Sequence, residues 1–184
     1  RFARWYLGPF LWEDAKGRIA IEEGNVVVRD LVAGLHGGTV KAQGTLMPAG
    51  ERLAWEASAQ ATGLVLTERI GRPLSFIIPF LRVKKEAGQL KGRADLDLKL
   101  AAEDTTDAAI LKTLAGAGSA HLYDIEATNS ILLPLLSFRL DKAILREPFR
   151  FKDLEVSFDV GDGSIRPRPF ELEATPFGTN VREI

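Results

Sequence analysis

Hydrophobic and polar residues alternate one by one along most of this chain. The same period of two occurs in 38–46, 52–61 and 151–160. Alternation of this kind predicts β-strands in a sheet with one covered face and one wet face, whereas a helix would scatter the same residues around its circumference. In the clearest run, positions of one face are Leu90, Ala94, Leu96, Leu98 and Leu100, and those of the other are Lys91, Arg93, Asp95, Asp97 and Lys99.

The breaks between these runs predict an antiparallel arrangement. Residues 23–25 and 161–163 contain glycine with asparagine or aspartate and indicate tight hairpin turns, while Gly37-Gly38 and Ala49-Gly50 are looser breaks. Strands joined by short turns are antiparallel neighbours, and no helical crossover recurs along the chain. We therefore expect a mainly β fold, a curved antiparallel sheet of stacked β units. Further strands are expected at 18–22, 25–33, 118–127, 164–168 and 170–174.

Three segments depart from the alternation. Residues 105–114 are expected to form a short helix with Asp104 or Thr105 as N-cap and Gly116 as its stop. Residues 129–140 are expected to form an amphipathic helix with Pro134 near its first turn. Residues 67–83 are apolar, but Pro73 and Pro79 argue against one unbroken helix. We expect these short helices to cover the apolar, concave face of the sheet.

The composition narrows the class of function. Lys plus Arg is 24 and Asp plus Glu is 25, so neither the net charge nor any charged run favours a nucleic-acid partner. Cysteine is absent, which excludes disulfides and thiolate metal sites but does not identify the compartment. The chain begins at Arg1 rather than Met, and we interpret it as a segment of a longer protein whose anchor or targeting sequence lies elsewhere.

The sequence contains no catalytic motif that we recognise. The two histidines, His36 and His121, have no second ligand at metal spacing, so we expect no metal site and no cofactor. His36 precedes a glycine pair and is expected in a loop, and His121 is expected on a strand. The carboxylates of Asp95 and Asp97 could serve hydrolysis as a pair, but surface residues answering cross-strand lysines explain them better. We expect the protein not to be an enzyme.

The predicted apolar face is rich in small residues, which leaves room above the sheet. Voids forfeit dispersion contacts, so something fills that room. One candidate is the protein's own helices, and the other is an acyl chain or similar apolar ligand held between sheet and helices. The small residues are Ala42, Gly44, Ala57, Ala59, Ala61, Gly92 and Ala94.

Several passages resemble the AsmA-like family of bacterial envelope proteins, the group that includes AsmA, TamB and YhdP, and in particular its AsmA-like C-terminal region. Residues 31–46 resemble that family's recurring phrase, in which a strand reaches a glycine pair and returns as a second strand. Residues 89–100 resemble the next repeat. Residues 117–124, 129–136 and 151–165 resemble its final strand, helix and hairpin. The likeness covers most of residues 25–174 and carries no catalytic signature.

The resemblance implies a periplasmic protein tethered to the inner membrane, whose apolar β groove shelters phospholipid acyl chains on their way to the outer membrane. On this interpretation residues 25–184 form the AsmA-like domain, and residues 1–24 form a capping or partner-facing segment with Trp5, Tyr6 and Trp12 as contacts for a protein partner. The alternative is a structural or protein-interaction domain with a self-filled core and no ligand. The expected groove residues are Ala57, Ala59, Ala94, Leu96, Leu98, Leu132, Leu136, Val156 and Phe158.

Overall fold

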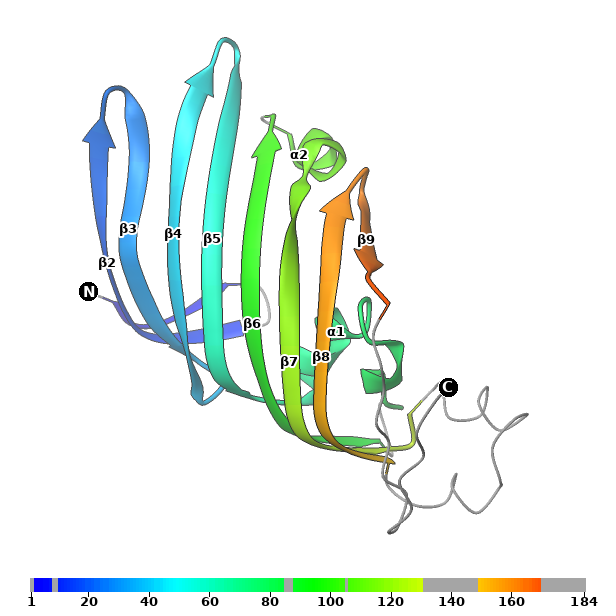
Figure 1. The fold of residues 1–184 in the computed structure, drawn as a ribbon. Coiled ribbons are helices and arrows are strands. Elements are labelled where there is room, and N and C mark those ends of the chain that lie inside the picture. The colour runs from blue at the N-terminus through cyan, green and yellow to red at the C-terminus, as the bar shows by residue number, and fades with distance from the viewer. Residues whose placement is uncertain (1, 8–9, 85–87, 105, 131–148, 170–184) are drawn as a thin grey trace. The chain divides into compact units, whose positions relative to one another are not determined.

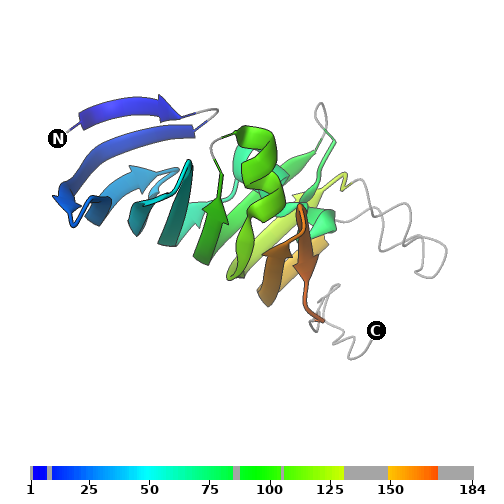
Figure 2. The same cartoon turned by 90° about the horizontal axis from the view of Figure 1, so that it is seen from above.

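The structure, a computed structural model, describes residues 2–7, 10–84, 88–104, 106–130 and 149–169. Its nine strands follow one another across one sheet in chain order (Figure 1 and Figure 2). The pairs whose register is resolved are antiparallel, and the prediction of a mainly β, antiparallel sheet is confirmed. The strands are β1 (Phe2–Leu7), β2 (Phe10–Glu22), β3 (Asn25–Leu35), β4 (Gly38–Ala49), β5 (Arg52–Val65), β6 (Gln89–Glu103), β7 (Ala115–Thr128), β8 (Phe149–Gly161) and β9 (Ser164–Pro167).

The chain divides into two compact units that share these strands. Unit 1 comprises residues 1–64, 95–120 and 157–168, and unit 2 comprises residues 65–94, 121–156 and 169–184. Unit 1 therefore holds β1 to β4, most of β5 and β9, and unit 2 holds the elements between β5 and β6. Curvature of the sheet and its covering by amphipathic helices stay predictions.

The two hairpin turns at Gly37-Gly38 and Ala49-Gly50 are tighter than the sequence indicated. Leu35 pairs with Gly38 and Ala49 pairs with Arg52, so each of these connections has two residues. His36 and Gly37 have φ of 45° and 76°, the left-handed values of a type I′ turn. The expectation of looser breaks at these two places is therefore wrong, whereas His36 does lie in a loop as expected.

The helices are shorter than predicted. Helix α2 spans Asp107–Thr113, and its N-cap is Thr106, whose side chain accepts a hydrogen bond from the Ala109 backbone N–H. The expected caps, Asp104 and Thr105, are therefore wrong, because a hydroxyl one residue further along satisfies the first turn. Gly116 is not the helix stop but lies inside β7.

Residues 67–83 do not form one unbroken helix, as predicted from the two prolines. They form α1 (Glu68–Leu74), with Pro73 in its last turn, and the 3-10 turn η1 (Pro79–Leu81). The expected helix at 129–140 and strand at 170–174 lie outside the described residues, apart from Asn129 and Ser130. No helix among the described residues is long and apolar enough to cross a bilayer.

Residues 10–22 form a full strand, although the sequence predicted one only for 18–22. Strand β2 pairs with β3 from Trp12↔Leu35 to Glu22↔Asn25, with register shifts near Lys16. Asp14 has φ of 49°, a left-handed conformation that accompanies such irregularities. Whether residues 1–24 act as a capping or partner-facing segment stays a prediction.

Each unit buries apolar side chains of its own. In unit 2, α1 lies against β6, since a Cβ added to Gly71 would overlap the Leu90 side chain. In unit 1, Gly118 of β7 lies beneath Phe158 of β8, and an added Cβ would be 2.5 Å from the ring. The buried apolar residues include Ala33, Val40, Ala61, Leu64 and Phe158 in unit 1, and Ile78, Leu81, Leu122, Ile125 and Val156 in unit 2.

Arg168, which follows β9, forms hydrogen bonds with β8 at the open end of the β8–β9 hairpin in unit 1. Its Nη2 and Nε donate to the two carboxylate oxygens of Asp159 at 2.7 and 3.0 Å, and its backbone N–H donates to the Ser157 carbonyl. The hydrogen bond from Arg168 lowers the pKa of Asp159 below its ordinary value. A lowered pKa contributes stability that is present above the unfolded value and is lost as the pH falls through the folded one.

We expect the Arg168→Gln variant to raise the pKa of Asp159 back toward its ordinary value, because the charged donor is lost. The measurement is an NMR titration of the Asp159 carboxyl carbon in the full chain. Arg166→Gln is the matched control, since Arg166 pairs with Asp162 instead. An Asp159 titration that is the same in the wild type and in Arg168→Gln would contradict the assigned cause.

Candidate functional site

Register places the apolar side chains of β2 to β5 in rows that run across the strands on one face of unit 1. The first row joins Ile21, Val26, Leu46 and Trp55 through successive pairs. The second row joins Ile19, Val28, Gly44 and Ala57 in the same way. Because side chains alternate between faces, these eight residues share one surface. We call them the open apolar patch.

The apolar face is exposed at this end and buried further along the same strands. Ile19 and Ile21 are 76% and 80% exposed, Leu46 is 36% exposed and Ala57 is exposed. Ala33, Val40 and Ala61, which form a row on the same face nearer the opposite ends of β3 to β5, are at most 8% exposed. The other four residues of the patch, Val26, Val28, Gly44 and Trp55, are half-buried. Single exposed apolar residues are ordinary, whereas a large group of them on one face is typical of a binding surface.

The residues expected to line a groove fall into two groups by burial. Ala57 is exposed, and Ala59, Leu96 and Leu98 are half-buried, so part of each has surface to offer a ligand. Ala94, Val156 and Phe158 are buried, as core residues are. Leu132 and Leu136 lie outside the described residues. A groove that includes all nine residues stays a prediction.

The aromatic residues expected to meet a protein partner lie at the start of the sheet. Trp5 of β1 pairs in register with Trp12 of β2, and Tyr6 pairs with Leu11. Trp12 is half-buried and already interacts with another group of the chain. A partner at Trp5, Tyr6 and Trp12 stays a prediction.

A cavity of about 650 Å³ lies over the middle of β3 to β7, entirely within unit 1. Its lining takes three consecutive residues from each of β3, β4, β5 and β6, centred on Val28, Gly44, Ala57 and Leu100. A hollow on the apolar face would have Leu46, Trp55 and Leu98 as its walls, but none of these residues lines the cavity. The wet-face residues on either side of the central row do line it, among them Gln43, Thr45, Glu56 and Ser58. The cavity is therefore a hollow of the wet face.

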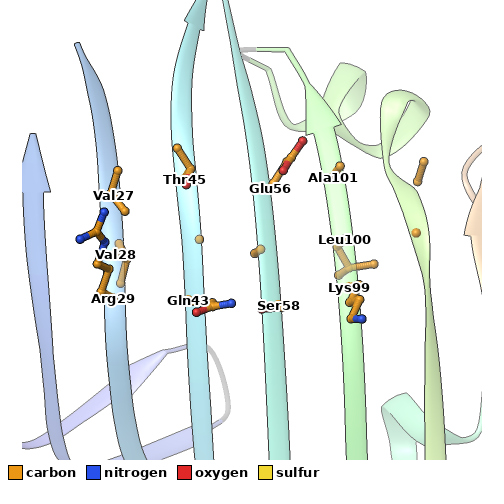
Figure 3. Close-up of a pocket in the computed structure, with 14 residues that line it drawn as sticks. Val27, Val28, Arg29, Gln43, Thr45, Glu56, Ser58, Lys99, Leu100 and Ala101 are labelled. Atoms are coloured by element: carbon orange, nitrogen blue, oxygen red, sulfur yellow. The ribbon is translucent and has the colours of Figure 1, made fainter. Parts of the chain in front are cut away.

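We call this hollow the polar trough, and we define it by six side chains: Arg29, Gln43, Thr45, Glu56, Ser58 and Lys99. Gln43 pairs with Ser58, and Thr45 pairs with Glu56, so these four form two adjacent rows. Figure 3 shows Arg29 on β3 and Lys99 on β6 at the two ends, with Gln43 and Ser58 between them. Ala101 of β6 and Ala115 of β7 also line the trough, and their short side chains leave space above these two strands.

The wet face around the trough is held by hydrogen bonds. Asp97 accepts from Gln60 Nε2 at 2.8 Å, and Asp95 accepts from the Gly63 backbone N–H at 2.6 Å. An amide and a backbone N–H thus contact these two carboxylates, and the expectation that cross-strand lysines answer them stays a prediction. The two acids act as structural acceptors in these bonds.

The histidines also lie apart from any cluster of ligands. His121 is exposed on β7, where its Nε2 contacts the Asp153 carboxylate of β8 and its ring lies 5.4 Å from that of Tyr123. His36 meets Phe10 edge to face, with ring centroids 6.0 Å apart. Among the residues that the structure describes, no group of three histidine or acidic side chains could hold a metal ion.

Comparison with known protein families, with curated proteins and with solved structures finds no match for this chain. The candidate sites therefore stand on geometry and chemistry alone: an apolar patch on one face of unit 1 and a polar trough on the other.

Sequence reasoning found the apolar face but missed the trough. Arg29, Gln43, Ser58 and Lys99 lie on four different strands, and they come together in one row only in the folded sheet (Figure 3). The sequence offered only a weak indication of the trough, namely the polar residues at alternate positions of each strand. Any sheet with one solvent-exposed face has such residues, so they do not single out a site.

Proposed function

We propose that this chain is a non-enzymatic module of a bacterial envelope protein that holds phospholipid acyl chains on the apolar face of its β-sheet. The observation that carries the proposal is the exposure of Ile19 and Ile21, at 76% and 80%, beside Leu46 and Ala57 on the same face. Each CH₂ of an acyl chain that leaves water there gains about 0.8 kcal/mol.

The small side chains of the patch favour an elongated occupant. Gly44 and Ala57 lie side by side in one row, with Val28 and Ile19 beyond them. A row of small residues lets a narrow chain approach the sheet closely, which increases dispersion contacts. Together with the resemblance to AsmA-like proteins, this supports a role in outer-membrane biogenesis and phospholipid transport. In this proposal the module lies in the periplasm, and the parent protein tethers it to the inner membrane.

A second candidate, a structural or protein-interaction domain with a self-filled core, is favoured by a different observation. In unit 2 the same alternation gives buried side chains, with Ile125 and Val156 at most 1% exposed and α1 seated against Leu90. If the whole apolar face is filled in this way, no acyl chain binds.

Binding of a fluorescent palmitate analogue to the full chain tests the proposal. We expect saturable binding that the double variant Ile19→Glu/Ile21→Glu weakens about tenfold or more, because two exposed apolar contacts become charges. Val32→Glu is the matched control: Val32 is 37% exposed but pairs with Lys41 on the wet face, so its binding should be unchanged.

Native mass spectrometry of the chain with dipalmitoyl phosphatidylglycerol extends the test to a phospholipid, with a one-to-one complex expected for the wild type and for Val32→Glu. A wild-type chain that binds neither probe, or a double variant that binds as well as Val32→Glu, would overturn the proposal and favour the self-filled domain.

A further inference from the structure

The polar trough has a cationic side chain at each of its two ends, Arg29 on β3 and Lys99 on β6. Arg18 of β2 pairs directly across from Arg29, and like charges in that position are destabilising. One carboxylate, that of Glu22, accepts from Arg29 Nη2 at 2.5 Å, so this end of the trough keeps an excess positive charge. At the other end Lys99 is exposed and, among the described residues, forms no ion pair.

The two cationic ends are separated by neutral groups. Arg29 on β3 and Lys99 on β6 are three strand spacings apart, about 14 Å at the usual separation of neighbouring strands. Gln43 and Ser58 lie between them in one row, and both can donate and accept. A small anion could therefore touch one cation only, while an elongated ligand could touch both.

Glu56 decides which class of elongated ligand fits. Its carboxylate lines the trough beside Thr45 and can only accept hydrogen bonds when ionised. A densely charged polyanion such as nucleic acid would be repelled there. A carbohydrate, by contrast, has hydroxyl groups that can donate to Glu56 and also exchange hydrogen bonds with Gln43 and Ser58.

We propose that the polar trough binds an anionic oligosaccharide, with one acidic group at Arg29, another at Lys99, and the sugar hydroxyls against Gln43, Ser58 and Glu56. The cavity of about 650 Å³ falls within the range of ordinary ligand sites. Guanidinium and ammonium groups bind sulfate, phosphate and carboxylate alike. This site lies on the face opposite the open apolar patch and does not depend on the lipid proposal.

Isothermal titration of the full chain with a hyaluronan tetrasaccharide, which carries a carboxylate on every second sugar, tests the site, with neutral chitotetraose and inorganic phosphate as comparison probes. We expect the hyaluronan tetrasaccharide to bind at least about tenfold more tightly than either. Arg29→Gln and Lys99→Gln should each weaken it about tenfold, because each removes one charge-assisted contact. Glu22→Gln should tighten it, because it releases Arg29 from its internal partner.

Lys112→Gln is the matched control, because Lys112 is an exposed cation of α2 in the same unit, does not line the trough, and its loss changes the net charge equally. Ile19→Glu/Ile21→Glu should bind the tetrasaccharide like the wild type, which separates this site from the lipid site. A chain that does not bind the tetrasaccharide overturns the proposal. So does equal weakening by Lys112→Gln and Lys99→Gln, or inorganic phosphate bound as tightly as the tetrasaccharide.

Discussion

Replacing Gly116 with alanine is expected to destabilise unit 1 by roughly 2–5 kcal/mol. Gly116 lies in β7 with φ of 155°, which side chains disfavour, and an added Cβ would overlap the Lys99 carbonyl oxygen. The same Cβ would lie 3.0 Å from the Leu100 Cα, so both obstacles are backbone or fixed to it. The methyl group therefore fits only if β6 and β7 move apart.

The three tryptophans, Trp5, Trp12 and Trp55, all belong to unit 1, so urea unfolding followed by tryptophan fluorescence reports on the unit that contains Gly116. Gly161→Ala is the matched control. Gly161 ends β8 in the same unit, and nothing lies within 4 Å of its would-be Cβ. Alanine there should be neutral or stabilising by less than about 1 kcal/mol. Equal midpoints for the two variants would contradict the close approach of β6 and β7.

The alternation of side chains was enough to predict the strands and their two faces. Asp97 and Leu98 lie on opposite faces of β6, because successive side chains of a strand alternate. Asp97 accepts a hydrogen bond from Gln60 on the wet face, whereas Leu98 lies near Gly118 and Phe158 on the apolar face. Where the alternation is interrupted, the prediction failed. Around Asp14 the register of β2 shifts, so residues 10–17 lose the simple pattern although they are paired.

Burial along a strand could not be predicted in the same way. Ala57 and Val156 both stand at apolar positions of alternating runs, yet one is exposed and the other fully buried. The difference depends on which other parts of the chain reach each position, and local sequence does not contain that information. The turn at His36 was also beyond the pattern, since a non-glycine residue adopts a left-handed φ of 45° there.

The second large effect follows from this difference in burial. Val156→Asp is expected to lose about 4 kcal/mol or more of stability, a large fraction of the roughly 5–15 kcal/mol that a domain has. Val156 has no exposed surface and lies among the buried residues of unit 2. A carboxylate there gives up its hydration without a partner. Amide hydrogen exchange over β7 and β8 measures the loss, because these strands hold the buried residues of unit 2 that flank the substitution.

Ala57→Asp is the matched comparison, because it places the same carboxylate at an apolar-face position that the structure leaves exposed. Its stability should fall by less than about 1 kcal/mol, while its affinity for the palmitate analogue should drop. If both variants unfold alike, Ala57 is a core residue and the apolar face is filled throughout, as the self-filled domain requires. If Ala57→Asp alone folds and binds poorly, exposure along the strands, rather than apolar character, separates the residues that hold the fold from those that hold a ligand.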